Sequence, residues 1–222
     1  MSFLTLAIET SNPAAAPDAA GVALGIPGNE VDVEPLMPAS RHDDALMPAI
    51  DRLCRRNDVA PGDISRIAVS AGPGGYTSIR IAVTTAKTIA RATGASCIAV
   101  PTAQAIVHRL GGQVTGHATV ALAWKRDDVW CQRFDDGAPT DDGGIQTLAA
   151  LVNEPGTVIA EPRLLQALTD AGHAPAIVVH PVFDPASVLA VSAGRDAVEP
   201  AHLLPLYPRA PEAVRKWREL HP

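Results

Sequence analysis

Three strand-like segments follow one another at the start of this chain, before any helical pattern begins. Proline, glycine and asparagine separate these short apolar runs, as is typical of strands joined by turns. The segments are FLTLAIE (3–9), AGVALGI (20–26) and VDVEPLM (31–37). The apolar spacing becomes helical after Ser40, and Ser40 with Asp43 resembles a capping box. Helix, strand, helix, strand and helix then follow as far as Leu110, so we predict an α/β fold with a mixed sheet flanked by helices.

This order of elements is that of a ribonuclease H-like fold, the building block of the actin-like ATPase (ASKHA) superfamily. The order narrows the fold but does not give the activity. Past Gln113 come a hairpin-like strand pair, an acidic turn-rich loop and two further strand–helix pairs. We therefore expect two lobes, an N-terminal lobe at 1–112 and a smaller α/β lobe at 113–196. The segment 197–222 should pack back on the first lobe and end in a short polar helix.

Charge and hydropathy exclude two classes of direct partner. The formal net charge is -6 and no dense basic run occurs, so unaided binding to a nucleic-acid backbone is not expected. No stretch approaches the ~20 apolar residues of a membrane span. The first residues lack the basic start and long apolar core of a signal peptide, which predicts a cytoplasmic protein without membrane contact.

A glycine cluster stands between a predicted strand and a predicted helix. Gly72, Gly74 and Gly75 permit backbone angles closed to other residues and let a ligand approach closely. The next helix begins near Tyr76 or Thr77, where unpaired N–H groups and the helix dipole favour an anion. The pattern is neither a Walker loop nor G-x-G-x-x-G, so a tight strand-to-helix turn is the competing interpretation.

Acidic and hydroxyl side chains near this loop suggest two enzymatic alternatives. Glu9 ends the first strand beside Thr10, where nucleotide-hydrolysing members of the superfamily orient Mg²⁺ and water; it could equally cap the turn. With the loop, Glu9 and Thr10 complete a candidate nucleotide or phosphate site. Ser70, Thr77 and Ser78 supply hydroxyls for a peptidase, but no G-x-S-x-G nucleophile elbow occurs. An independent ATPase and a glycoprotease-like peptidase therefore remain the alternatives.

Several motifs together resemble the TsaB family, whose members take part in threonylcarbamoyladenosine (t6A) formation in tRNA. AGPGGYTSIRIAVTTAKTIA (71–90) is similar to the family's glycine-rich signature, although Gly75 and Ser78 replace its usual Ser and Gly. LTLAIETS (4–11) resembles the first strand of the family, and SRHDDALMPAIDRL (40–53) its first helix. LLPLYPRAPEA (203–213) resembles its C-terminal P-L-Y-L-R segment. The second lobe matches the family in length alone.

The resemblance implies a protein that is not an enzyme on its own. The catalytic relative TsaD carries a metal-binding H-x-x-x-H pair after its fifth strand, and here Thr102 and Ile106 occupy those positions. We therefore expect no metal and no required cofactor, with at most weak ATP or ADP binding at the interface of a complex. The implied partners are a TsaD-like transferase, a TsaE-like ATPase and, in isolation, a second copy of this chain. Contact with tRNA would occur only through the complex.

Two helices provide the expected partner surface. The first helix has an apolar arc of roughly 200°, wider than the ~100° stripe that packing on one sheet requires. The second has a row of small residues, with Ile81 off that row. In the TsaB family these two helices form the dimer and TsaD interface, whereas coverage by the chain's own second lobe or tail is the competing interpretation. The expected interface residues are Ala45, Ala49, Leu53, Ile81, Ala82, Thr85 and Thr88.

Overall fold

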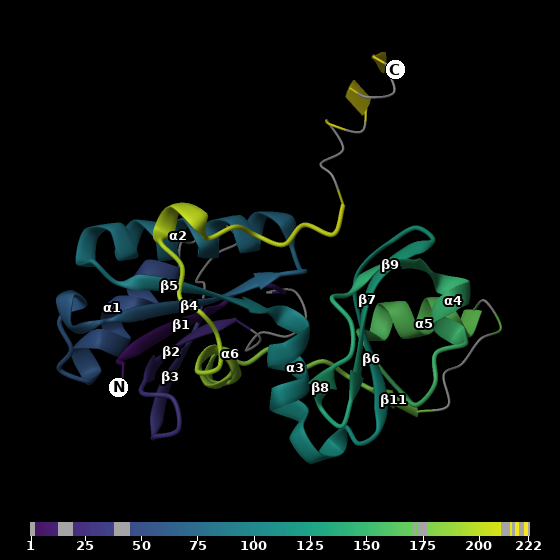
Figure 1. Cartoon of the computed structure of the whole chain (residues 1–222), viewed down its shortest axis with the longest axis horizontal. Helices are drawn as coiled ribbons and strands as arrows, with labels where there is room; N and C mark the ends of the chain where they lie inside the picture. Colours follow the sequence, from purple (N-terminus) through teal and green to yellow (C-terminus); the bar gives the residue numbers. More distant parts are fainter. Residues whose placement is uncertain are drawn as a thin grey trace.

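The chain folds into two lobes, each built around its own sheet and lying side by side in Figure 1. This computed structural model describes residues 3–12, 20–37, 45–170, 172, 177–209, 214, 216, 217, 220 and 221. The first sheet contains β1 to β5 and the second β6 to β11. Both combine parallel and antiparallel pairs, which confirms the predicted α/β architecture with mixed sheets.

The first sheet has the strand order β3-β2-β1-β4-β5. The three N-terminal strands pair antiparallel, and β4 and β5 extend the sheet parallel to β1. The strands are β1 (Thr5–Glu9), β2 (Gly21–Gly25), β3 (Val31–Pro35), β4 (Arg66–Gly72) and β5 (Ser96–Pro101). All three predicted N-terminal strands are thus present. The predicted capping box of Ser40 and Asp43 lies outside the described residues.

Two pairs of helices cover the two faces of this sheet. They are α1 (Leu46–Arg56), α2 (Tyr76–Thr93), α3 (Thr102–Leu110) and α6 (Pro185–Ser192). Successive side chains of a strand point to opposite faces. Leu6 and Ile8 of β1 therefore pack in the cluster that includes α1 and α2, while Ala7 packs in the cluster that includes α3 and α6. Short 3-10 turns occur at η1 (Pro61–Asp63), η2 (Gly111–Gln113) and η3 (Pro200–His202).

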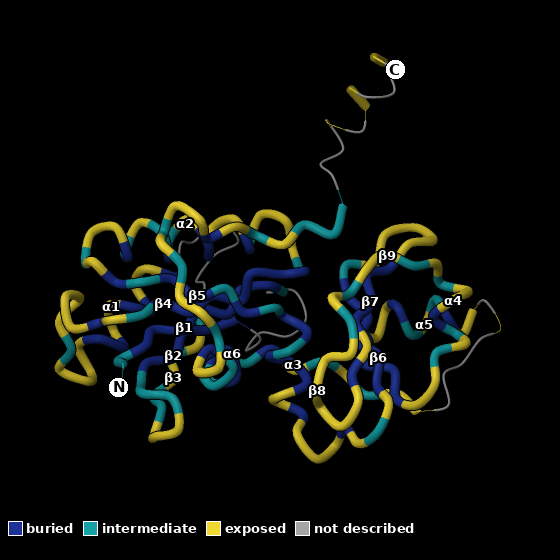
Figure 2. The backbone as a smooth tube through the Cα atoms, viewed as in Figure 1, coloured by how far each residue is buried: buried dark blue, intermediate teal, exposed yellow. Residues whose placement is uncertain are grey.

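Helix α2 has the bounds that its sequence predicts. Gly75 precedes it in an extended conformation, and Gly94 ends it with φ +81°, the left-handed geometry that glycine adopts at helix ends. Its buried stripe includes Ile79, Ala86 and Ala90, spaced at helical intervals along the face toward the sheet. In Figure 2 the opposite side of α2 is exposed.

The second sheet has the strand order β11-β10-β6-β7-β8, with β9 pairing with β7. Its elements are β6 (His117–Lys125), β7 (Asp128–Asp135), β8 (Ala138–Pro139), β9 (Gly144–Thr147), α4 (Leu148–Val152), β10 (Thr157–Ala160), α5 (Pro162–Asp170) and β11 (Ile177–Val179). Helices α4 and α5 share a buried cluster with one face, and α3 shares one with the other. Helix α3 therefore lies between the lobes.

The chain returns to the first lobe before its C-terminus. Helix α6 packs against β1 and β2, with Val188 and Leu189 fully buried, so the expected second lobe at 113–196 includes a helix that belongs to the first sheet. Beyond α6, Leu203 is buried in the cluster of α1 and α2. Most of the expected polar C-terminal helix lies outside the described residues. No helix in the described part of the chain is long and apolar enough to cross a membrane.

Candidate functional site

The glycine loop between β4 and α2 is packed against the chain's own backbone. Gly72 has φ +114°, and a Cβ there would lie 2.6 Å from the carbonyl oxygen of Leu206. A Cβ on Gly74 would overlap the carbonyl oxygen of Ser11, which also accepts the backbone N–H of Gly75 at 2.6 Å. Two of the three glycines are thus required by close backbone approach within the protein. This geometry favours the tight turn over a phosphate loop.

Glu9 lies fully buried at the end of β1. Its Oε1 accepts hydrogen bonds from the backbone N–H and the hydroxyl of Ser11, both at 2.6 Å. Its Oε2 has no hydrogen-bond partner, and burial raises the pKa of the carboxyl. The neighbouring Thr10 donates its hydroxyl to the carbonyl of Ser78 in the first turn of α2, at 3.1 Å. Both side chains hold the turn after β1 in place. For Glu9 this contact fits the capping role rather than the binding of Mg²⁺ and water.

The positions that correspond to the TsaD histidine pair lie in the interior. Thr102 is fully buried, and its hydroxyl is 2.8 Å from that of Ser70. Ile106 packs in the cluster between α3 and the second sheet. The hydroxyl of Ser70 thus meets another hydroxyl rather than the imidazole that would activate a nucleophile. Across the described residues, no group of three or more His, Cys, Asp or Glu side chains could hold a metal ion.

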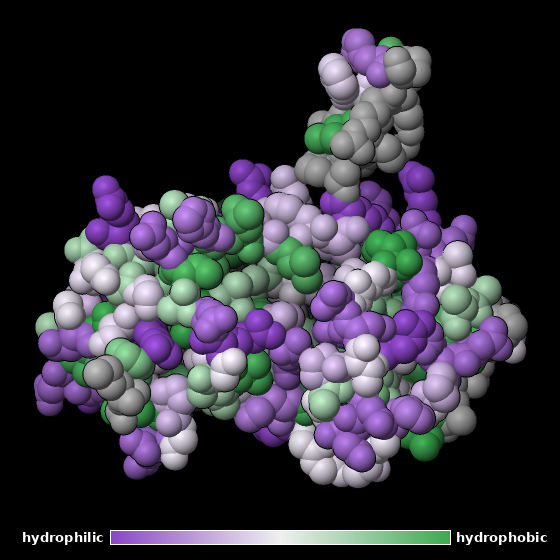
Figure 3. All heavy atoms as spheres, in the orientation of Figure 1, coloured by the Kyte–Doolittle hydropathy of each residue, from purple (hydrophilic) through white to green (hydrophobic). Residues whose placement is uncertain are grey.

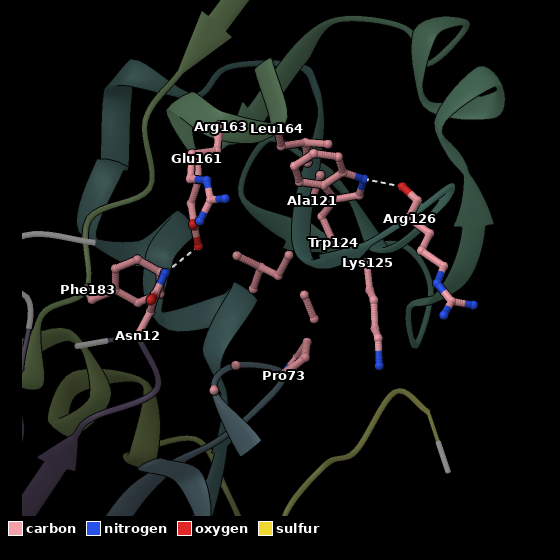
Figure 4. A pocket seen from close by; sticks show the side chains of 14 residues that line it. Asn12, Pro73, Ala121, Trp124, Lys125, Arg126, Glu161, Arg163, Leu164 and Phe183 are labelled. Carbon is pink, nitrogen blue, oxygen red and sulfur yellow. Dashed lines mark hydrogen bonds between the residues drawn. The ribbon is translucent and has the colours of Figure 1, made fainter. Parts of the chain in front are cut away.

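A cleft of about 360 Å³ opens between the lobes. Gly74 and Gly75 line one side, and the second lobe supplies most of the rest, seen from close by in Figure 4. Asn12 donates from its side-chain amide to Oε1 of Glu161, which joins the first lobe to the second across the cleft. The side chains that line the cleft from the second lobe and the segment after it include Trp124, Lys125, Arg126, Glu161, Arg163, Leu164 and Phe183.

The cleft combines basic, acidic and aromatic groups. Burial raises the pKa of Glu161, so its carboxyl keeps its proton to a higher pH than an exposed one. The indole N–H of Trp124 donates to the carbonyl of Arg126 at 2.5 Å, which fixes the ring at the tip of the β6–β7 hairpin. Such a cleft has the size of a small-molecule site. Sequence reasoning missed its second-lobe residues because that lobe matched no motif.

The structure does not bring the predicted nucleotide residues into one site. Gly74 and Gly75 line the cleft, whereas Glu9 and Thr10 are buried behind the loop. Tyr76 packs against Tyr207 of the C-terminal segment, with ring centroids 4.9 Å apart and ring planes tilted by 32°. Gly72 is covered by Leu206, and Thr77 faces outward on α2.

Three of the predicted interface residues have no surface to offer a partner. Ala49 and Leu53 of α1 and Ala82 of α2 are each 0% exposed, because the two helices pack in one cluster on the same face of the sheet. Most of the wide apolar arc of α1 is thus used within the first lobe, in the cluster with the sheet and α2, while Met47 of the same helix is 46% exposed. The other predicted positions reach the surface to different degrees: Ala45 and Thr85 are half-buried, and Thr88 and Ile81 are exposed.

The exposed side of α2 has an apolar centre. Ile81 is 51% exposed and lies in a shallow hollow of about 340 Å³ whose rim is formed by Thr77, Arg80, Thr84 and Thr85. The guanidinium of Arg80 stands 5.3 Å from the ring centroid of Tyr76. The expectation that Ile81 lies off the core-facing stripe is confirmed.

Parts of this chain are similar to known proteins. Residues 32–125 match the family model described as TsaD, tRNA N6-adenosine threonylcarbamoyltransferase. A segment of 49 residues is 51% identical to the tRNA threonylcarbamoyladenosine biosynthesis protein TsaB of Bacillus subtilis, and covers 22% of this chain and 21% of that protein. Together with the motifs above, these findings support a TsaB-type protein. 

Other relatives cover nearly the whole of the chain. An uncharacterized protein of Mycobacterium tuberculosis strain H37Rv is 29% identical over 94% of this chain and 92% of its own length. The structure of a Pseudomonas aeruginosa protein with similarity to peptidase YeaZ has a TM-score of 0.73 at 22% identity, over 93% of this chain and 100% of that one. YeaZ from Pseudomonas aeruginosa has a TM-score of 0.71 at 20% identity, over 92% and 99%. These two structures confirm the expected fold.

Proposed function

We propose that this chain is a non-catalytic partner of a TsaD-type transferase in the t6A modification of tRNA. The transferase family model and the Bacillus subtilis relative support involvement in this modification. The finer parts of the proposal are a homodimer in isolation, a TsaE-like ATPase as a further partner, and contact with tRNA through the complex alone. The chain would act in the cytoplasm and require no cofactor of its own.

The observation that carries the partner role is the exposed Ile81 on α2. A large apolar side chain in a hollow rimmed by threonines and Arg80 resembles the apolar centre and polar rim of a protein interface. Burying that side chain against a partner would contribute roughly 25 cal/mol for each Å² of apolar surface removed from water. Of the predicted interface residues, Ile81, Thr85 and Thr88 reach the surface and can contact a partner directly. The buried Ala49, Leu53 and Ala82 instead pack α1 and α2 on the sheet.

The interior chemistry supports a role without catalysis. Ser70 and Thr102 bind each other, and Glu9 binds Ser11, so these polar groups serve the fold. The side chain at position 106 is an isoleucine in a hydrophobic cluster. A general base or a nucleophile needs access to substrate, and the hydroxyl and carboxyl groups of this cluster are buried.

The partner role is tested with Ile81→Glu and the TsaD homologue from the same cell. We expect the dissociation constant to rise by about 100-fold or more, because the variant places an unpaired charge in the contact. Ile177→Glu is the matched control, since Ile177 is 56% exposed on β11 of the other lobe. Equal affinity of both variants and the unmodified chain would remove α2 from the interface.

The non-catalytic role is tested by a transfer assay with tRNA, threonine, bicarbonate and ATP plus the enzyme that makes threonylcarbamoyl-adenylate. We expect no t6A with this chain alone, and formation of t6A when the TsaD homologue is added. Robust modification by the chain without that homologue would show that it is itself the transferase.

A further inference from the structure

Residues 198–209 end the last long continuous stretch that the structure describes, run along the first lobe and reach the second. We refer to them as the C-terminal strap. It begins at the edge of the first sheet, where Val198 and Cys97 of β5 exchange two backbone hydrogen bonds of 2.7 and 3.0 Å. In Figure 1 the strap crosses α2 and continues toward the second lobe.

The middle of the strap is fixed to α2 and to the glycine loop. Leu203 is fully buried in the core, and the ammonium of Lys87 donates to the carbonyl of Leu203 at 3.3 Å. The backbone N–H of Leu206 donates to the carbonyl of Ala71 at 2.7 Å, and its own carbonyl lies over Gly72. This part of the strap therefore moves with the first lobe.

The side chain of Arg209 fixes the end of the strap to the other lobe. The guanidinium of Arg209 donates to the carbonyl of Ala123 at 2.5 Å and to the carbonyl of Asp128 at 2.7 Å. Ala123 belongs to β6 and Asp128 begins β7, so the planar fork of Arg209 joins both strands at the tip of their hairpin. Bonds from a charged donor are stronger than those between neutral groups.

Arg209 binds the hairpin where its backbone is irregular. Ala123 has φ +52°, a left-handed conformation that costs free energy for a residue with a side chain. Between the pairs Leu122–Trp130 and Lys125–Asp128, Ala123 and Trp124 together oppose Val129, which makes a β-bulge. The bulge sets the direction of Trp124, whose ring lines the cleft between the lobes.

We propose that the C-terminal strap is an inter-lobe tether in which Arg209 is a positioning residue. Arg209 stabilises the bulge at Ala123, holds Trp124 at the mouth of the cleft, and so sets how far the cleft opens. Release of Arg209 frees the hairpin tip, while the rest of the strap stays on the first lobe through Leu203 and Leu206.

A second consequence rests on the proposed function. Leu204 and Leu206 of the strap are 69% and 42% exposed and follow the N-terminal half of α2, and apolar atoms are visible where the strap crosses the first lobe in Figure 3. A transferase seated on Ile81 would also cover the strap. The tether then transmits partner binding on α2 to the hairpin and the cleft.

The tether is tested by amide hydrogen exchange on the full-length chain. In Arg209→Gln we expect the amides of 122–130 to exchange about ten-fold faster or more, with β1 and β4 unchanged. Arg209→Lys should give a smaller acceleration, because its ammonium can still donate to one carbonyl although it lacks the planar fork that spans two. Arg91→Gln is the control, an exposed arginine on α2 whose loss should leave the hairpin unchanged. Unchanged exchange at the hairpin in Arg209→Gln, or equal acceleration in every strand, would overturn the tether.

A second measurement separates this inference from the proposed function. Addition of the TsaD homologue should slow exchange at 122–130 in the unmodified chain and have little effect there in Arg209→Gln. Failure of the homologue to bind at all would contradict the proposed function and leave the result in the isolated chain standing. Binding that slows the hairpin equally in both proteins would show that the strap does not transmit it.

Discussion

The carbonyl oxygen of Ser11 lies directly over the glycine loop and accepts the backbone N–H of Gly75 at 2.6 Å. The turn after β1 and the start of α2 are thus joined through their backbones. A side chain on Gly74 has no room beneath that carbonyl. The loop is a corner from which α2 begins, and close packing within the chain explains Gly72 and Gly74 without a ligand.

Gly74→Ala should therefore lower the free energy of unfolding by about 1–3 kcal/mol, the usual cost of forcing atoms into a packed site. Gly62→Ala is the matched control, because a Cβ there meets no atom within 4 Å; its effect should stay below about 1 kcal/mol. Urea unfolding followed by circular dichroism measures both. Equal stability of the two variants would mean that the backbone around Gly74 can move aside for a Cβ atom.

Titration of the unmodified chain with ATP and Mg²⁺ in a calorimeter should give weak binding or none. The nucleotide candidates are divided among the buried turn, the cleft and the outer face of α2, so no single cradle of backbone N–H groups surrounds a phosphate. Micromolar affinity would contradict this and return the loop to the class of nucleotide sites.

Glu9→Gln should flatten the dependence of stability on pH. Because burial raises the pKa of Glu9 above 4.5, the folded state keeps a proton that the unfolded state has lost. The free energy of unfolding of the unmodified protein therefore falls as pH rises from 4.5 through the raised pKa. The glutamine variant has no titratable group at position 9, so its stability relative to the unmodified chain should increase as the pH rises across this range. Glu30→Gln, an exposed site, is the control, and parallel curves for all three proteins would refute the role of Glu9.

Truncation of two isoleucines of α2 should change stability by very different amounts. Ile79 is 1% exposed and Ile81 is 51% exposed, although they stand two residues apart. Ile79→Ala should cost about 2–5 kcal/mol of stability through the cavity it leaves. Ile81→Ala should change stability by less than about 0.5 kcal/mol, as is usual at the surface. Thermal unfolding of both variants decides the matter, and a large loss in Ile81→Ala would assign that side chain to the fold.

The first lobe was largely predictable because its patterns are local. The helical spacing and flanking glycines of α2 give its bounds, and α3 likewise spans Thr102–Leu110 as expected. Which residues of a helix remain exposed was less predictable. The row of small residues on α2 that includes Ala82 suggested a partner surface. Small residues serve equally well for close packing on the chain's own sheet.

The cleft could not be predicted, since it depends on contacts distant in sequence. Asn12 meets Glu161, and Arg209 meets Ala123, pairs that no periodicity connects. The segment around Arg209 was expected to pack on the first lobe, and its sequence did not indicate the contact with the second lobe. Helix α6 was predicted as a helix, but the apolar residues of PASVLAVS (185–192) do not indicate which sheet they cover.

Because α6 returns to β1 and β2, the first lobe is assembled from both ends of the chain. During synthesis, the part of the sheet face that α6 covers, over β1 and β2, stays exposed until Val188 and Leu189 have been made. The strands of the second sheet, β6 to β11, are synthesised before then as one contiguous stretch of the chain. The ribosome therefore begins the first lobe before the second but completes it later. A nascent chain halted before α6 should be a substrate for chaperones.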